Sequence, residues 1–236
     1  MKYLYLSLLS LLAVYLLVLL FIYFTQRNLL YQPGDNNYLD DKIQFSYKEV
    51  FIEVDQDIKL KSWLIEKDLK KYKTLAFFHG NAGNLFNRVH KLNELHKLDI
   101  NILIISWRGF SGNSGNPTEK NLYQDAQKSI EWLNSKGIES KKIILYGESL
   151  GTGVAVELAQ KNIFNSIILE SPFTSMAKTA KIYYPYLPVN LLLKDKYDSI
   201  NKIHKITKPI LIMHGMKDDL VPYIMSVELF NKANKP

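Results

Sequence analysis

The stretch that decides the fold runs from Gly147 to Gly151 and reads Gly-Glu-Ser-Leu-Gly. An apolar, β-branched run at 143–146 precedes it, and a run of small residues at 152–156 follows it. This order predicts a strand that turns sharply into a helix, with Ser149 at the corner in a strained backbone conformation. Its oxygen would be exposed at the helix N-terminus, where backbone N–H groups and the helix dipole can stabilise an oxyanion. We therefore predict that Ser149 is a nucleophile of acyl transfer.

A second stretch, residues 74–84, agrees with the first. An apolar strand at 74–78 leads into a His-Gly turn that is rich in Gly and Asn. The alternative is that this stretch is an ordinary strand-to-helix turn without a catalytic role. In an acyl-transfer site one oxyanion donor is the residue after the nucleophile, and the other lies in the loop after the third strand. The first donor would be the N–H of Leu150. We expect Asn81 to supply the second, with Ala82 as the alternative.

Four stretches together resemble the α/β-hydrolase superfamily, in particular its membrane-anchored serine hydrolases of the esterase or thioesterase type. They are residues 78–84, 107–115, 147–151 and 214–222, in the family's order, and the resemblance covers about residues 45 to 232. It implies an α/β fold with a mostly parallel sheet and helices on both faces. The second stretch is similar to the family's turn after the fourth strand, which shapes the rim of the site.

The resemblance also implies the triad acid. In the family the carboxylate lies three residues beyond the glycine that follows a buried strand, here Gly215, which indicates Asp218. Its role would be to hold an imidazole in one tautomer and to stabilise it when charged. The next residue, Asp219, is the alternative triad acid. The pair could also end the strand and cap the next helix without a catalytic role.

The third member that the resemblance implies is a histidine after the acid, but no histidine follows His214. We therefore expect the domain to be incomplete at its C-terminus, without the family's eighth strand and final helix, and the strand at 209–213 to be an exposed apolar edge. Loss of the base costs on the order of a million-fold in turnover, so the chain as given would be nearly inactive. His79 is the nearest substitute, although its family counterpart supports the oxyanion loop. The alternatives are a non-catalytic protein of the same fold and a serine peptidase.

The N-terminus predicts a membrane anchor at residues 1–30, followed by the hydrolase domain at 31–236. Residues 4–24 carry no charge, and a helix of this length can cross about 30 Å of hydrocarbon. A cleaved signal peptide is the alternative, but the stretch at 25–31 offers no small-residue cleavage site. We expect a single span with the catalytic domain on the extracytoplasmic side. The absence of cysteine leaves the redox compartment open.

The rest of the chain alternates strands and helices, as a parallel α/β sheet requires. An antiparallel edge pair is predicted at 43–54 and 58–66, and helix 222–231 is expected to face inward with Val227 and Phe230. The further strands are predicted at 74–78, 101–105, 141–146, 166–170 and 209–213, and the other helices at 85–97, 118–136 and 149–160.

Residues 171–206 interrupt this alternation with three prolines and an aromatic cluster at 183–187, which predicts a cap over Ser149. Such a cap would favour a small-molecule or lipid-like acyl ester, although the aromatic residues could equally pack on the sheet. The net charge of +7 is spread over lysine pairs, a pattern that argues against nucleic acid. The histidine spacing offers no zinc site, so we expect neither a metal nor a cofactor. Protein partners are not predicted.

Overall fold

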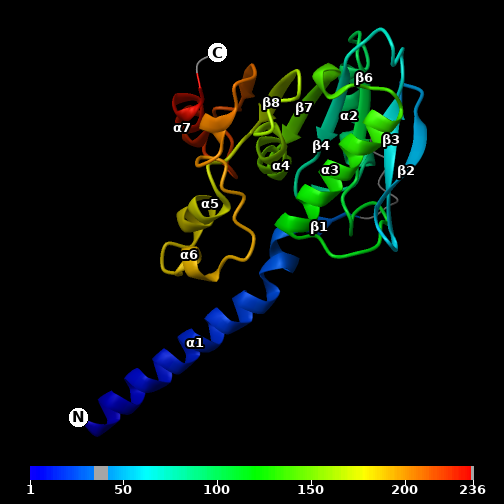
Figure 1. The fold of residues 1–236 in the computed structure, drawn as a ribbon. Coiled ribbons are helices and arrows are strands. Elements are labelled where there is room, and N and C mark those ends of the chain that lie inside the picture. The colour runs from blue at the N-terminus through cyan, green and yellow to red at the C-terminus, as the bar shows by residue number, and fades with distance from the viewer. Residues whose placement is uncertain (35–41, 235–236) are drawn as a thin grey trace.

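The computed structural model describes residues 1–34 and 42–234, so parts of the expected hydrolase domain, at 35–41 and 235–236, lie outside the described residues. A seven-stranded sheet in the order β2-β3-β6-β4-β7-β8-β9 forms its centre (Figure 1). Strands β6, β4, β7, β8 and β9 are parallel, and β2 and β3 form an antiparallel pair at one edge. The bounds are β2 Lys48–Asp55, β3 Ile58–Ile65, β4 Thr74–Phe78, β6 Asn101–Ile105, β7 Ile143–Glu148, β8 Ser166–Glu170 and β9 Ile210–Met213.

Helices cover both faces of the sheet, because the central strands are apolar on both sides. One core joins inward side chains of β4 and β6 to α3 (Glu119–Ser135) and α4 (Leu150–Ala159). The other core joins the opposite side chains of the same strands to α2 (Val89–Leu95). The remaining elements are α1 Lys2–Leu30, β1 Gln32–Pro33, β5 Ala82–Gly83, α5 Met176–Tyr183, α6 Val189–Leu192, α7 Ile224–Lys232 and the short 3-10 turns Phe86–Arg88, Ser140–Lys142 and Ile203–Lys205. The mostly parallel α/β architecture expected from the sequence is confirmed.

Some predicted boundaries move. The edge strand expected from residue 43 begins at Lys48, and the helix expected at 85–97 divides into a 3-10 turn and α2. The inward face predicted for α7 is wrong. Val227 and Phe230 are 40% and 69% exposed, whereas Met225 and Leu229 are buried, because α7 packs against β9 and the 3-10 turn Ile203–Lys205.

Strand β9 ends the described sheet, next to β8. Its side chains alternate, with Ile210 and Ile212 half-buried on one face and Leu211 and Met213 exposed on the other. This pattern fits the apolar edge that the sequence predicts, and such an edge is a site for pairing with another chain.

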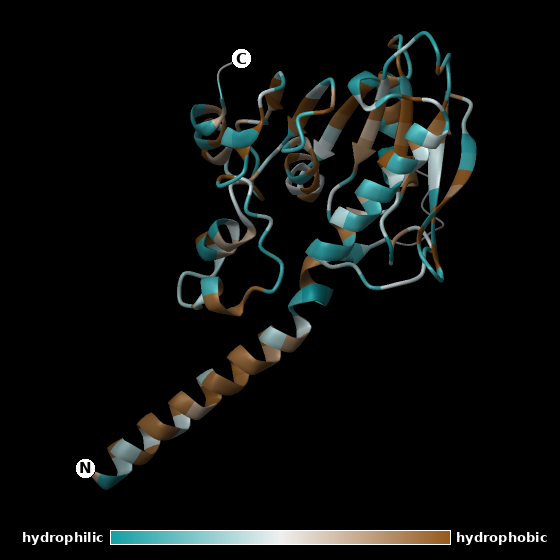
Figure 2. Cartoon of the chain, in the orientation of Figure 1, coloured by the Kyte–Doolittle hydropathy of each residue, from teal (hydrophilic) through white to brown (hydrophobic). Residues whose placement is uncertain are grey.

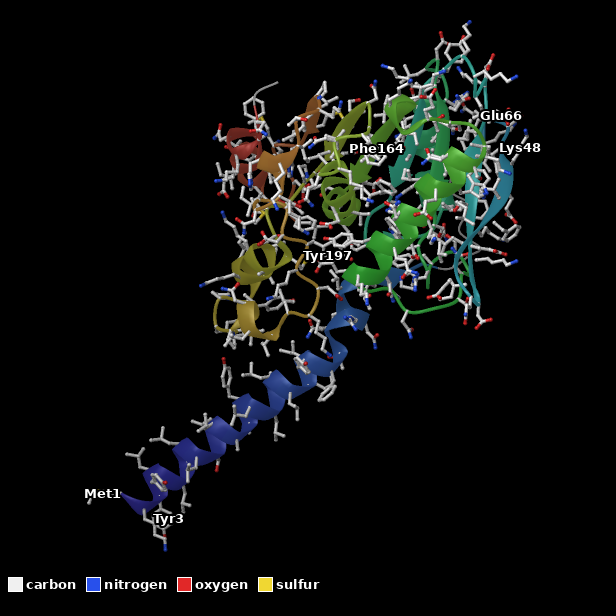
Figure 3. The ribbon with its side chains drawn as sticks, viewed as in Figure 1. Met1, Tyr3, Lys48, Glu66, Phe164 and Tyr197 are labelled. Atoms are coloured by element: carbon white, nitrogen blue, oxygen red, sulfur yellow. The ribbon has the colours of Figure 1, made fainter. Side chains whose placement is uncertain are left out.

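Helix α1 extends away from the sheet and is hydrophobic along most of its length (Figure 2). Among the described residues it is the one helix long and apolar enough to cross a membrane, a test that a signal sequence also passes. Its C-terminal turn is fixed to the domain. Arg27 pairs with the buried Asp195 at 2.9 Å, and the Tyr31 hydroxyl lies 2.8 Å from the Tyr197 hydroxyl. Figure 3 labels Tyr197 at this junction, far from Met1 and Tyr3 at the other end of α1.

Candidate functional site

Ser149 lies at the corner between β7 and α4 with φ +48° and ψ −116°. A left-handed φ is strained for a residue with a side chain, and such strain is found at functional sites. The two flanking positions must be glycine because the backbone leaves no room for a Cβ atom there. A Cβ on Gly151 would lie 2.0 Å from the Phe78 carbonyl oxygen, and a Cβ on Gly147 would lie 2.6 Å from the Gly151 carbonyl oxygen. The strand-to-helix corner with a strained Ser149 therefore occurs where the sequence predicts it, and Ser149 is half-buried there.

The loop after β4 lies against this corner. A Cβ built on Gly80 would be 3.5 Å from the Ser149 Cβ, so the segment of Gly80 and Asn81 borders the serine. Leu150 is the first residue of α4, and its N–H has no acceptor within the helix. Within the described part of the chain, neither the N–H of Leu150 nor that of Asn81 donates to another residue. Both groups are thus available to an oxyanion beside Ser149.

The same loop is attached to the end of α1, a feature that the sequence did not predict. The Asn81 side-chain amide donates to the Leu30 carbonyl at 2.7 Å, and the Gln32 N–H donates to the Asn81 carbonyl at 2.8 Å. β1 and β5 extend this attachment as a short parallel pair, in which Ala82, the alternative oxyanion donor, lies opposite Gln32. The helix expected to anchor the protein therefore ends directly on the loop expected to bind the oxyanion.

His79 supports this loop from within the core. The side chain is fully buried, and Nδ1 donates to the Gly80 carbonyl at 2.7 Å. The Trp107 indole N–H donates to the His79 carbonyl at 3.0 Å. Burial, assisted by the charge of Arg88, lowers the pKa of His79 to about 3. The residue is neutral near pH 7 and serves the supporting role that the resemblance implies for it.

Asp218 follows β9 and is held by several donors. Its Oδ1 accepts hydrogen bonds from the N–H groups of Leu220 and Val221, each at 2.9 Å. Burial alone would raise the pKa of Asp218, but these two N–H groups, the Ser171 hydroxyl and the nearby His214 outweigh it and lower the pKa below its usual value. The carboxylate is therefore ionised at neutral pH.

Asp219, the alternative acid, is exposed, and its carbonyl accepts from the Tyr183 hydroxyl at 2.6 Å. Its pattern of contacts provides no comparable support for the carboxylate. Of the two acids, Asp218 is the one built into the structure.

His214 directly follows β9 and lies close to Asp218. Its Nε2 lies 2.7 Å from the Val221 carbonyl and 3.3 Å from Asp218 Oδ2, while Nδ1 contacts the Ser226 hydroxyl on α7. Since the carbonyl must accept, Nε2 carries the proton and Nδ1 accepts from the serine. Both ring nitrogens are engaged, so this histidine orients the Asp218 loop, and its hydrogen bonds go to Ser226 and Val221 rather than to Ser149.

Because β7, β8 and β9 are parallel neighbours, Ser149, Ser171 and Asp218 all follow strand ends at the same edge of the sheet. Ser171 also has a positive φ, of 48°, and its N–H donates to the Met213 carbonyl at 2.8 Å. The predicted nucleophile and acid thus follow strands that end on the same side of the sheet, with β8 between β7 and β9. No group of His, Asp and Glu in the described ranges is placed to hold a metal ion.

A charged cluster beside Ser149 was not predicted. Glu148 pairs with Arg88 at 3.0 Å and with Lys91 at 2.8 Å, and Lys91 also reaches Glu170 at 2.6 Å. Burial would raise the pKa of Glu148, but the two cations outweigh it and lower the pKa. These residues come from β7, β8 and the segment around α2, so only the fold brings them together, and no sequence spacing indicates the cluster.

Comparison with known proteins gives a consistent result. Residues 97–236 match the prolyl oligopeptidase family. A Mycobacterium tuberculosis protein described as uncharacterized is 33% identical, over 93% of this chain and 79% of its own length. The protein bem46 of Schizosaccharomyces pombe is 32% identical, over 93% of this chain and 78% of its own. The structure of an esterase from Pyrococcus furiosus superposes with a TM-score of 0.69 at 22% identity, covering 86% of this chain and 82% of that one.

Proposed function

Because this chain belongs to the prolyl oligopeptidase family, within the α/β-hydrolase superfamily, we propose that it is a serine hydrolase in which Ser149 attacks a carboxylic ester or thioester. The observation that carries the proposal is the strained Ser149 at the N-terminus of α4, bordered by the Gly80–Asn81 loop. The superfamily membership by itself gives a hydrolase of this fold. The nucleophile is proposed from this geometry, and the ester or thioester class from the resemblance of the sequence to esterases and thioesterases.

In the proposed reaction the Ser149 oxygen bonds to the carbonyl carbon of the substrate and gives its proton to a base. The oxygen of the tetrahedral intermediate accepts hydrogen bonds from the N–H groups of Leu150 and Asn81. These hydrogen bonds strengthen as negative charge develops on the oxygen. The bond to the leaving alcohol or thiol then breaks, and the leaving group takes the proton. Water releases the acyl group by the same steps, and Asp218 orients and stabilises the imidazole that carries the proton.

The base is the open part of this mechanism. His79 is buried and neutral, and His214 is held between Ser226 and Val221. We propose that the base is an imidazole oriented by the Asp218 carboxylate.

Reaction of the membrane-purified protein with a fluorophosphonate probe tests the nucleophile. We expect the wild type to be labelled, Ser149→Ala to lose the label, and Ser135→Ala, a change at an exposed serine at the end of α3, to keep it. A folded protein that stays unlabelled would overturn the hydrolase proposal in favour of a non-catalytic protein of the same fold.

A serine peptidase is the second candidate, and the name of the matched family favours it. Amide and ester cleavage use the same nucleophile and oxyanion groups, so the site geometry does not separate them. Rates on a peptide anilide and on an ester with the same acyl group would do so. Preference for the anilide would replace our proposed substrate class without affecting the role of Ser149.

A further inference from the structure

The connection through α5 and α6 presents an apolar surface beside α1. Residues 182–193, here called the α6 segment, carry no charged side chain and lie between Lys181 and Lys194. Within the segment, Tyr186 is 68% exposed and Leu191 is 86% exposed. Large apolar side chains that gather on a surface mark an interaction site.

Hydrogen bonds hold the α6 segment alongside the apolar helix α1. The Tyr15 hydroxyl donates to the Tyr186 carbonyl at 2.9 Å, and α6 contacts α1 directly (Figure 1). Gln26 donates to the Leu192 carbonyl at 3.0 Å and accepts from the Lys194 N–H at 2.8 Å. The α6 segment therefore lies along the C-terminal half of the apolar helix.

Both stretches change from apolar to charged at one level. Arg27 of α1 pairs with Asp195, and the Lys194 ammonium lies 4.0 Å from the centre of the Tyr23 ring. A helix rises 1.5 Å per residue, so Tyr15 lies about 18 Å along the axis from Arg27. Its bond to Tyr186 then puts the Tyr186 end of the α6 segment on the order of 10 Å on the apolar side of the charged level, whereas the Leu192 end, bonded to Gln26, lies close to that level.

We propose that the α6 segment inserts into the leaflet of the lipid bilayer that α1 enters, with Tyr186 and Leu191 among the acyl chains. Uncharged runs of this length are typical of interfacial or re-entrant segments. Backbone polar groups must be satisfied in such a medium, and the Tyr15 hydroxyl satisfies the Tyr186 carbonyl. Lys181 and Lys194 at its two ends extend to the headgroups. This inference rests on α1 being a membrane anchor, and it is independent of the proposed activity.

The absence of cysteine in the sequence makes single-cysteine variants direct probes of depth. Leu191→Cys tests the segment, and Leu11→Cys tests the anchor. The matched control is Leu98→Cys, which is 54% exposed in the wild type and precedes β6, at the amino-terminal end of the parallel strands and so opposite the end that leads to Ser149. Each full-length variant is labelled with an NBD fluorophore in detergent and reconstituted into phosphatidylcholine vesicles that carry nitroxide on the upper acyl chain.

Interfacial segments bury their apolar face about 5–10 Å, so we expect blue-shifted, quenched NBD emission at position 191, as at position 11, and unquenched emission at position 98. Emission at 191 that matches 98, while 11 is protected, overturns the inference and leaves the anchor intact; a second protein chain is then the better occupant. Unquenched emission at both 11 and 191 overturns the anchor and the inference together.

Discussion

At the scale of single residues, the position of Gly151 is set by contact between two backbones. A methyl group there would meet the Phe78 carbonyl at 2.0 Å, and neither β4 nor α4 can move without disturbing the core. We expect Gly151→Ala to lower the free energy of unfolding by at least about 3 kcal/mol. Gly215→Ala is the control, since nothing lies within 4 Å of its Cβ position, and it should cost less than about 1 kcal/mol. Thermal unfolding in detergent measures both, and equal midpoints would contradict the assigned contact.

His79 makes stability depend on pH. Its pKa in the folded protein is about 3, below the value of about 6.5 in an unfolded chain. The unfolded state therefore binds a proton below pH 6.5 that the native state does not bind, and stability falls as the pH falls through that range. Between pH 7 and pH 5 we expect the free energy of unfolding of the wild type to fall by about 2 kcal/mol more than that of His79→Gln. The other titratable groups are the same in both proteins, so their contributions cancel in this difference. Parallel pH profiles for the two proteins would show that His79 titrates normally.

At the scale of elements, local pattern and tertiary contact can be separated. The strands at 74–78, 101–105 and 166–170 were predicted at their observed bounds, because buried parallel strands are continuous apolar runs between turn residues. The inner face of α7 could not be predicted, because it depends on how that short helix packs against β9. Likewise the Ser149 turn follows from adjacent glycines, whereas the contact of His214 with Asp218 and the Glu148 cluster arises only when separate elements meet.

The attachment of the oxyanion loop to α1 gives a prediction about two elements. Asn81→Ala keeps the backbone N–H proposed to bind the oxyanion but removes the hydrogen bond to the Leu30 carbonyl. We expect the free energy of unfolding to fall by about 1 kcal/mol, the usual contribution of a neutral hydrogen bond. We also expect the rate of fluorophosphonate labelling to fall roughly tenfold, because the loop would lose its alignment with Ser149. Asn134→Ala, an exposed change at the end of α3, is the control. An unchanged labelling rate would mean that the attachment only supports the fold.

At the scale of the whole molecule, the proposed site and the apolar helix lie on the same side of the sheet. Parallel strands present their carboxyl ends at one edge, and the loop after β4 at that edge is bonded to the end of α1. If α1 and the α6 segment enter one leaflet, Ser149 faces lipid that diffuses in the same bilayer. A long-chain acyl ester should then be cleaved at least roughly tenfold faster in vesicles that also contain the protein than in separate vesicles, because confinement to one bilayer raises the effective concentration. A short, water-soluble ester should be cleaved at equal rates in both arrangements, which controls for the amount of active protein. Equal rates for the long-chain ester would show that substrate reaches Ser149 from water, and the orientation of the site toward the bilayer would have to be abandoned even if the serine is active.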